Sequence, residues 1–163
     1  DFWFVRWRHV TTLRKSMDNP AVAAVLNQLL DAEQQSVVLR VAESTPFVSL
    51  AEVAAGNLVR GMARSSRTHR EQLTEMILNL GGQPVPRRAD LLSGNLHYLD
   101  LFSVLPRLLE AQESLVSQYR QRSPRLASDR QAADLAGKIL ARHEADLQKL
   151  RDAIPARPTA SAG

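Results

Sequence analysis

Four side chains of the kinds that bind transition metals recur at comparable places along the chain. Glu33, His69, Glu113 and His143 each fall near the middle of a stripe of apolar residues with helical spacing. A carboxylate that faces a protein core is costly unless it is paired or bound to a cation. Two carboxylates and two imidazoles suit a transition-metal ion. The sequence therefore predicts either a metal site or a buried Glu–His hydrogen-bond network without metal.

The third of these positions has an alternative. Glu113 faces inward by its spacing, and Glu110, three residues earlier on the flank of the same stripe, is the substitute ligand. An edge position that reaches water is the other interpretation for Glu33, Glu113 and Glu110. Tyr119 is expected to pack with its hydroxyl at the boundary of the bundle.

Four amphipathic segments must position these side chains, and we predict helices at about residues 19–44, 49–81, 97–121 and 128–154. Asn19 before Pro20 is a good helix start. Ser49 with Glu52, and Ser128 with Gln131, have capping-box spacing. The second helix should stop at Gly81-Gly82. Each predicted helix carries one of the four candidate ligands.

The connection over residues 82–96 is rich in turn-forming residues and is long enough to travel most of a helix length. Such a connection lets the third helix run parallel to the second. The expected fold is therefore all-α, a four-helix bundle with one long crossover between the second and third helices.

Composition narrows the class of protein. The 163 residues are 44% apolar and only 5% aromatic, and they include no cysteine; this mix favours one helical domain and excludes thiolate metal sites. No run of about 18 apolar residues occurs, so no transmembrane segment is predicted. Residues 1–16 carry three of the four net positive charges, so no nucleic-acid partner is expected. We expect a cytoplasmic protein.

The ends differ from the predicted bundle over residues 17–155. Residues 1–16 hold both tryptophans and several basic residues. We interpret this segment either as a non-native extension before Met17 or as an aromatic, basic arm that contacts a partner or a membrane surface. Residues 156–163 are small and polar, and we expect a flexible tail.

The sequence resembles the ferritin-like superfamily, nearest to its bacterioferritin-like branch, over about residues 20–154. The resemblance is carried by LNQLLDAEQQSVVL, which contains Glu33, by SRTHREQLTEMILNLGGQP, which contains His69, and by Glu113 and His143 on the later helices. In that family, helices 1 and 3 each provide a metal-binding Glu, and helices 2 and 4 each provide a Glu-x-x-His pair. The family's di-iron centre oxidises iron(II) with dioxygen.

The chain departs from that pattern at both Glu-x-x-His pairs. Ser66 and Leu140 stand where the two glutamates are expected, and Arg67 stands where bacterioferritin-like chains carry the haem-ligating methionine. The resemblance therefore implies a reduced site for at most one ion, with iron the expected metal. Neither haem nor efficient ferroxidase turnover is expected.

Two functions from different classes follow. One is a ferritin-like protein that binds a single metal ion through Glu33, His69, Glu113 (or Glu110) and His143, with weak or no ferroxidase activity. The other is a metal-free structural or assembly bundle of the same superfamily. Bundles with exposed stripes readily self-associate, so a homo-oligomer, a dimer or larger, is expected in either case.

Overall fold

The protein is helical in a computed structural model that describes residues 2–43, 52–86 and 100–154. Its elements are α1 (Phe2–Gln34), α2 (Val37–Glu43), α3 (Val53–Asn79), α4 (Leu101–Arg122), the short 3-10 helix η3 (Ser123–Leu126) and α5 (Arg130–Ala153). This confirms the all-α prediction for the described residues. The predicted cap at Ser49 and the predicted start at His97 lie outside them.

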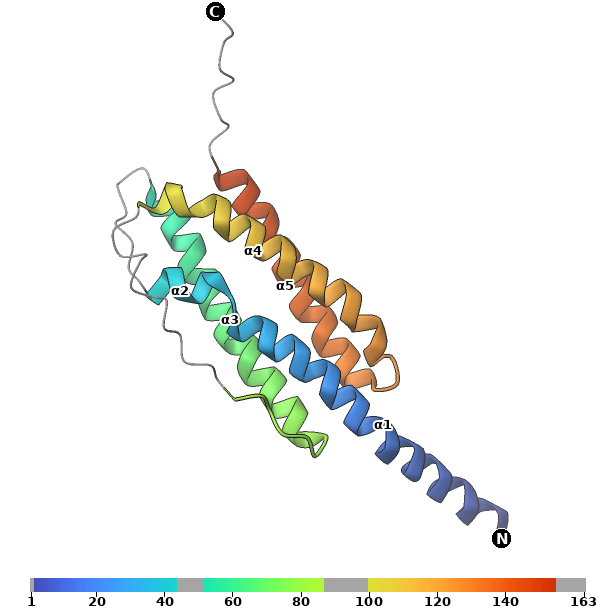
Figure 1. Cartoon of the computed structure of the whole chain (residues 1–163). Helices are drawn as coiled ribbons and strands as arrows, with labels where there is room; N and C mark the ends of the chain where they lie inside the picture. Colours follow the sequence, from blue (N-terminus) through green and yellow to red (C-terminus); the bar gives the residue numbers. More distant parts are fainter. Residues whose placement is uncertain (1, 44–51, 87–99, 155–163) are drawn as a thin grey trace, which may run out of the picture.

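The four long helices form a bundle in which each packs against two others (Figure 1). α1 contacts α3 and α4, and α5 also contacts α3 and α4. In Figure 1, α1 and α5 run one way along the bundle, and α3 and α4 run the other way. A hydrogen bond places the starts of α3 and α4 together, since Glu52 at the N-cap of α3 accepts from the Phe102 N–H of α4 at 2.9 Å.

The first helix differs from the prediction at both of its ends. It begins at Phe2 and not at Asn19, so Pro20 lies inside it. Proline lacks an N–H, so the helix passes Pro20 with one backbone hydrogen bond missing. It ends at Gln34, where the Ser36 N–H bonds the Glu33 carbonyl at 3.2 Å, and helix resumes only at Val37. The single predicted helix over 19–44 is therefore two helices with a break after Gln34.

Side-chain caps define the starts of the last two long helices. Asp100 accepts a hydrogen bond from the Ser103 N–H at the start of α4, and Asp129 accepts one from the Ala132 N–H at the start of α5. The predicted N-cap of the fourth helix, Ser128, is thus wrong by one residue. An aspartate at position 129 can reach the same free N–H groups as a capping serine, and its charge favours a helix N-terminus.

The end of α3 confirms the predicted stop at Gly81-Gly82. The Gly82 N–H bonds the Ile77 carbonyl and the Gly81 N–H bonds the Leu78 carbonyl, each at 2.9 Å, with Gly81 at a φ of 77°. A side chain at Gly82 would have no room, because an added Cβ would lie 2.9 Å from the Ala23 Cβ of α1. The helix end is therefore packed directly on α1.

From this end the chain lies along α1. Asn27 donates to the Gln83 carbonyl at 2.9 Å and accepts from the Val85 N–H at 2.8 Å. Gln34, two turns further along α1, donates to the Val85 carbonyl at 3.2 Å. The side chains of Asn27 and Gln34 therefore hold the backbone of the segment after α3 against α1.

Among the described residues, the core consists of two apolar clusters. One lies toward the α3–α1 packing at Gly82 and includes Leu26, Leu29, Leu73, Ile77 and Ile139. The other lies toward the starts of α3 and α4 and includes Val41, Met62, Leu105, Leu108 and Leu150. Each long helix contributes to one or both clusters, and in sequence Glu33, His69 and His143 fall between their members. The bundle therefore carries a polar layer between two apolar layers.

Candidate metal centre

Glu33 is the centre of this polar layer. Its side chain is fully buried on the last turn of α1. Its Oε1 accepts from the Tyr119 hydroxyl at 2.9 Å and lies 2.6 Å from His143 Nε2. Its Oε2 accepts from the Ser66 hydroxyl at 2.7 Å. The prediction that Glu33 points into the core is confirmed, and the edge position open to water is wrong.

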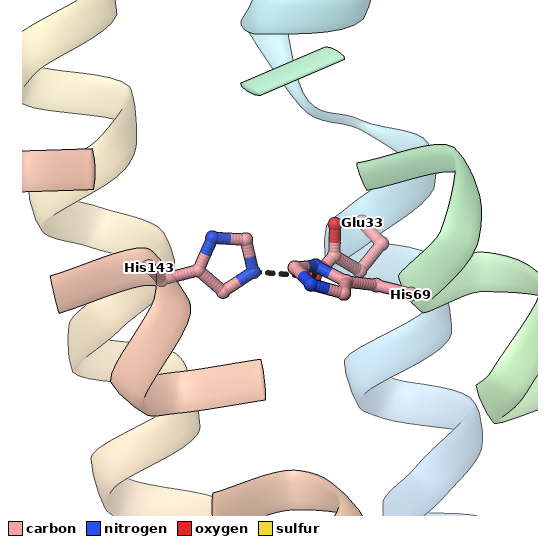
Figure 2. A group of neighbouring side chains, drawn as sticks. All are labelled: Glu33, His69 and His143. Atoms are coloured by element: carbon pink, nitrogen blue, oxygen red, sulfur yellow. Dashed lines mark hydrogen bonds and ion pairs between the residues drawn. The ribbon is translucent and has the colours of Figure 1, made fainter. Parts of the chain in front are cut away.

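His69 and His143 approach the same carboxylate from α3 and α5. Figure 2 shows His143 reaching across the bundle toward Glu33 and His69. The ring centroids of His69 and His143 are 4.9 Å apart, and the two ring planes meet at 79°. His69 Nδ1 lies 3.5 Å from Glu33 Oε1, and this buried nitrogen has no hydrogen-bond partner among the described residues. The convergence of the two imidazoles is therefore confirmed.

The three side chains lie close enough together to hold a metal ion. One ligand atom from each of Glu33, His69 and His143 lies within 4.8 Å of the others. Two ligands about 2.1 Å from one ion are separated by about 3–4 Å, so small side-chain movements suffice to bring all three onto one ion. This is the one group of three or more such side chains in the part of the chain that the structure describes.

The charge state of Glu33 follows from these contacts. Burial alone raises the pKa of a carboxyl group, but the hydrogen bond with His143, the close approach of His69 and the electrostatic attraction of both rings outweigh it and lower the pKa of Glu33 to about 2. Burial, the charge of Glu33 and the hydrogen bond to it raise the pKa of Tyr119 well above its usual value. The cluster therefore contains a carboxylate anion beside a neutral phenol at neutral pH.

The structure does not bring the second predicted carboxylate into the cluster. Glu113 lies on the exposed side of α4 and pairs with Arg151 of α5 at 2.9 Å, with its side chain 45% exposed. Glu110 is exposed as well. The prediction that Glu113 faces inward is wrong, because the residue of that turn that faces inward is its neighbour, Gln112, which is 2% exposed.

The sequence pattern did not identify two neighbours of Glu33 and His143, Gln112 and Tyr119, as part of the site. Gln112 Nε2 lies 3.1 Å from His143 Nδ1 and 3.1 Å from its backbone carbonyl. Tyr119 is fully buried and donates to Glu33, so the prediction of a hydroxyl at the bundle boundary is wrong. Gln112 and Tyr119 are seven residues apart, two helical turns, so the spacing of the stripe through Leu108 and Leu115 could have identified both.

Asp146 is a further buried carboxylate near the cluster in sequence. It is 1% exposed and lies three residues after His143 on α5. Its Oδ2 accepts from Arg142 at 3.1 Å, while its Oδ1 has no hydrogen-bond partner. It is not within ligand distance of the three candidate ligands. Leu140, where the resemblance to the ferritin-like superfamily implies the glutamate of the second Glu-x-x-His pair, packs against the first apolar cluster instead.

Comparison with known proteins does not assign this chain to a family. Neither a protein-family model nor a curated protein matches this sequence. Among the described residues, no helix is both long enough and apolar enough to cross a lipid bilayer. The functional interpretation therefore rests on the geometry of the polar layer.

Proposed function

We propose that the chain binds a single transition-metal ion through Glu33, His69 and His143, and that iron(II) is the ion. The observation that carries the proposal is the unpaired Nδ1 of His69, buried 3.5 Å from Glu33 Oε1. Buried polar atoms almost always have a hydrogen-bond partner, so a buried imidazole nitrogen that lacks one beside a carboxylate indicates the need for a partner. A cation between the two would supply it.

The donor set supports iron(II) in particular. Two histidines and one carboxylate, with further positions left open, are typical of mononuclear non-haem iron(II) sites. The same donors also occur in zinc sites. Ser66 binds the other oxygen of Glu33 at 2.7 Å and so keeps Oε1 turned toward the two imidazoles. The family resemblance, which implies iron, favours iron over zinc.

One ion, and not two, is supported by the charges of the cluster. Glu33 is its single carboxylate ligand, and Glu113 and Glu110 lie on the exposed side of α4. Two dications beside one carboxylate would leave about three positive charges uncompensated in a low-dielectric core, which is costly. We therefore propose weak or no ferroxidase activity, since coupled oxidation needs two ions held close together.

We also propose the ferritin-like topology, with a long crossover between α3 and α4. The hydrogen bond from Phe102 to Glu52 supports it, because it joins the starts of these two helices. The contacts of Val85 with Asn27 and Gln34 support it too, because a chain lying along α1 is returning toward that end. Cytoplasmic location and a homo-oligomer remain predictions.

A metal-free structural bundle is the second candidate, and one observation favours it. Tyr119, Ser66 and His143 all contact the Glu33 carboxylate at 2.9 Å or less, so the anion is satisfied without a cation. Buried polar networks with every member paired can fix the register of a bundle. In this network, only His69 Nδ1 is left over.

Metal content and equilibrium binding distinguish the two candidates. Purified protein is stripped with a chelator and titrated anaerobically with Fe²⁺, and separately with Co²⁺ and Zn²⁺, while bound metal is counted by elemental analysis. We expect one ion per chain, and loss of binding in His69→Ala and His143→Ala. Glu113→Ala is the matched control and should bind normally. Absence of binding by the folded wild-type protein would favour the structural bundle, and two irons per chain would contradict the single-ion proposal.

A further inference from the structure

Gln112 holds His143 from the side opposite Glu33. Its amide nitrogen lies 3.1 Å from the His143 backbone carbonyl and 3.1 Å from the ring nitrogen Nδ1. Gln112 is 2% exposed, so these contacts are made inside the protein. Glu33, the imidazole of His143 and the amide of Gln112 therefore form one hydrogen-bonded row from α1 through α5 to α4.

The backbone carbonyl determines which end of the Gln112 amide faces His143. A carbonyl oxygen only accepts hydrogen bonds, so the group 3.1 Å from it must be the amide NH₂ and not the amide oxygen. The second hydrogen of that NH₂ is then directed at Nδ1. An imidazole nitrogen accepts a hydrogen bond only when it carries a lone pair, so the ring proton of neutral His143 is on Nε2, which donates to Glu33 at 2.6 Å.

We infer that Gln112 is a positioning residue that keeps His143 in the Nε2–H tautomer and thereby weakens metal binding at that nitrogen. This inference rests on the proposed function, because His143 Nε2 is the atom that faces Glu33 and the candidate ion. A metal ligand must offer a lone pair, and metal-binding histidines usually donate their other N–H to an acceptor. Gln112 presents a donor at that place, which is the reverse arrangement.

Binding of an ion at Nε2 therefore requires a change of tautomer. The proton leaves Nε2 and a proton is taken up at Nδ1, so the ring stays neutral. The amide NH₂ of Gln112 must also turn away from Nδ1. Gln112 lines a pocket of about 170 Å³ between the α1–α2 break and α4, which also contacts Ser36, Ser114 and Gln118. This volume is large enough for several water molecules, which can form hydrogen bonds with the displaced amide.

The first test reads the tautomer of His143 in the metal-free protein. Two-bond ¹H–¹⁵N correlation spectra distinguish Nε2–H from Nδ1–H rings, and the His143 signals are assigned by their absence in His143→Gln. We expect the Nε2–H pattern in the wild-type protein. In Gln112→Glu the new carboxylate accepts a hydrogen bond from Nδ1–H, so the signal of Nδ1 should change to that of a protonated nitrogen. An Nδ1–H pattern in the wild-type protein would overturn the inference.

The second test measures the affinity of the wild-type protein and its variants for Co²⁺ and Zn²⁺. Gln112→Glu should bind at least about tenfold more tightly than wild type, a typical effect of the groups that orient metal ligands. Gln112→Met, which has similar length and no donor, should also bind more tightly, and it separates the tautomer from added charge. Gln118→Glu is the matched control, because it adds the same charge to α4 beside the same pocket. Circular dichroism checks that each variant is folded.

The outcomes separate this inference from the proposed function. If Gln112→Met binds no more tightly than wild type, or Gln112→Glu no more tightly than Gln118→Glu, Gln112 does not set the affinity and the inference is wrong. If no variant binds any ion while the wild-type ring shows the Nε2–H pattern, the proposed metal function fails and only the tautomer assignment stands. If Gln112→Glu does not fold, the Co²⁺ and Zn²⁺ affinities of a folded Gln112→Met variant still decide whether Gln112 weakens metal binding.

Discussion

His143 Nε2 and Glu33 Oε1 lie 2.6 Å apart, at a point where both side chains are almost fully buried. The two residues are 110 positions apart in the sequence and belong to α5 and α1. Hydrogen bonds to an ionised group are stronger than those between neutral groups. This contact therefore joins two helices that are not consecutive in the chain, and it sets the charge state of the cluster.

Replacing Glu33 by glutamine should remove metal binding and weaken the fold. Glutamine keeps the shape of the side chain but loses the charge that Tyr119, Ser66 and His143 contact. Hydrogen bonds to a charged partner contribute roughly 1.5–3 kcal/mol, so we expect a loss of about that size in the free energy of unfolding. Urea denaturation of the metal-free protein measures it. A Glu33→Gln variant that still bound one ion per chain would show that the ligands lie elsewhere.

Acid should destabilise the metal-free protein in a range set by Glu33. Its pKa falls from the usual 4.5 to about 2 on folding, so ionised Glu33 stabilises the fold fully above about pH 4.5. This stabilisation is lost as the pH falls toward about 2, and it amounts to about 3 kcal/mol. Unfolding free energies measured from pH 6 to pH 2 should show this decline in wild type, and a shallower decline in Glu33→Gln. Equal slopes would contradict the assignment.

The exposed pair of Glu113 and Arg151 should matter little. Both side chains are close to half exposed, and surface ion pairs contribute at most about 1 kcal/mol. We expect Glu113→Ala to change the free energy of unfolding by less than about 0.5 kcal/mol, with metal stoichiometry unchanged. Thermal denaturation and elemental analysis give the two values. A loss of bound metal in this variant would restore Glu113 as a ligand.

Removing the Tyr119 hydroxyl should affect stability more than metal binding. Tyr119→Phe deletes one of the donors to Glu33 and keeps the ring, which packs against His143 at a centroid distance of 5.3 Å. Ser66 and His143 still contact the carboxylate, so we expect a cost of about 1–2 kcal/mol and retention of one ion per chain. Ser66→Ala, which removes the donor to the other oxygen, is the comparison. A complete loss of the ion in Tyr119→Phe would give the phenol a direct part in the site.

Alanine at Gly82 should destabilise the end of α3. Its Cβ would lie 2.9 Å from the Ala23 Cβ and 3.1 Å from Ile77 Cγ2, so α1 and α3 would have to move apart. Overpacking of this kind costs roughly 1–3 kcal/mol. Gly137→Ala on α5 is the matched control, because nothing lies within 4 Å of the added atom there, and helix propensity favours alanine. Chemical denaturation of the two variants should give changes of opposite sign.

Helical spacing predicted most of the fold and three of the four candidate ligands. Glu33, His69 and His143 were identifiable because each is an ionisable residue on an otherwise apolar stripe. The choice of Glu113 as the fourth ligand was wrong. Gln112 and Glu113 are adjacent, and a helical stripe about 100° wide does not decide which of two neighbours faces inward. Glu113 was chosen as a ligand because a carboxylate binds metal ions. In the structure, Gln112 is the residue that packs inward toward α5. The break after Gln34 was also hidden, because residues 35–38 carry no glycine or proline that would mark it.

The break after Gln34 also places Glu33 at the negative end of a helix dipole. α1 ends at Gln34, one residue after Glu33, so the buried carboxylate sits at the C-terminal end of a 33-residue helix. The aligned peptide dipoles place roughly half a negative charge at such an end. An oxyanion would meet Glu33 and this helix end as like charges, whereas a cation would be attracted by both. The charges around the cluster would therefore favour a cation over an anion before ligand geometry takes effect.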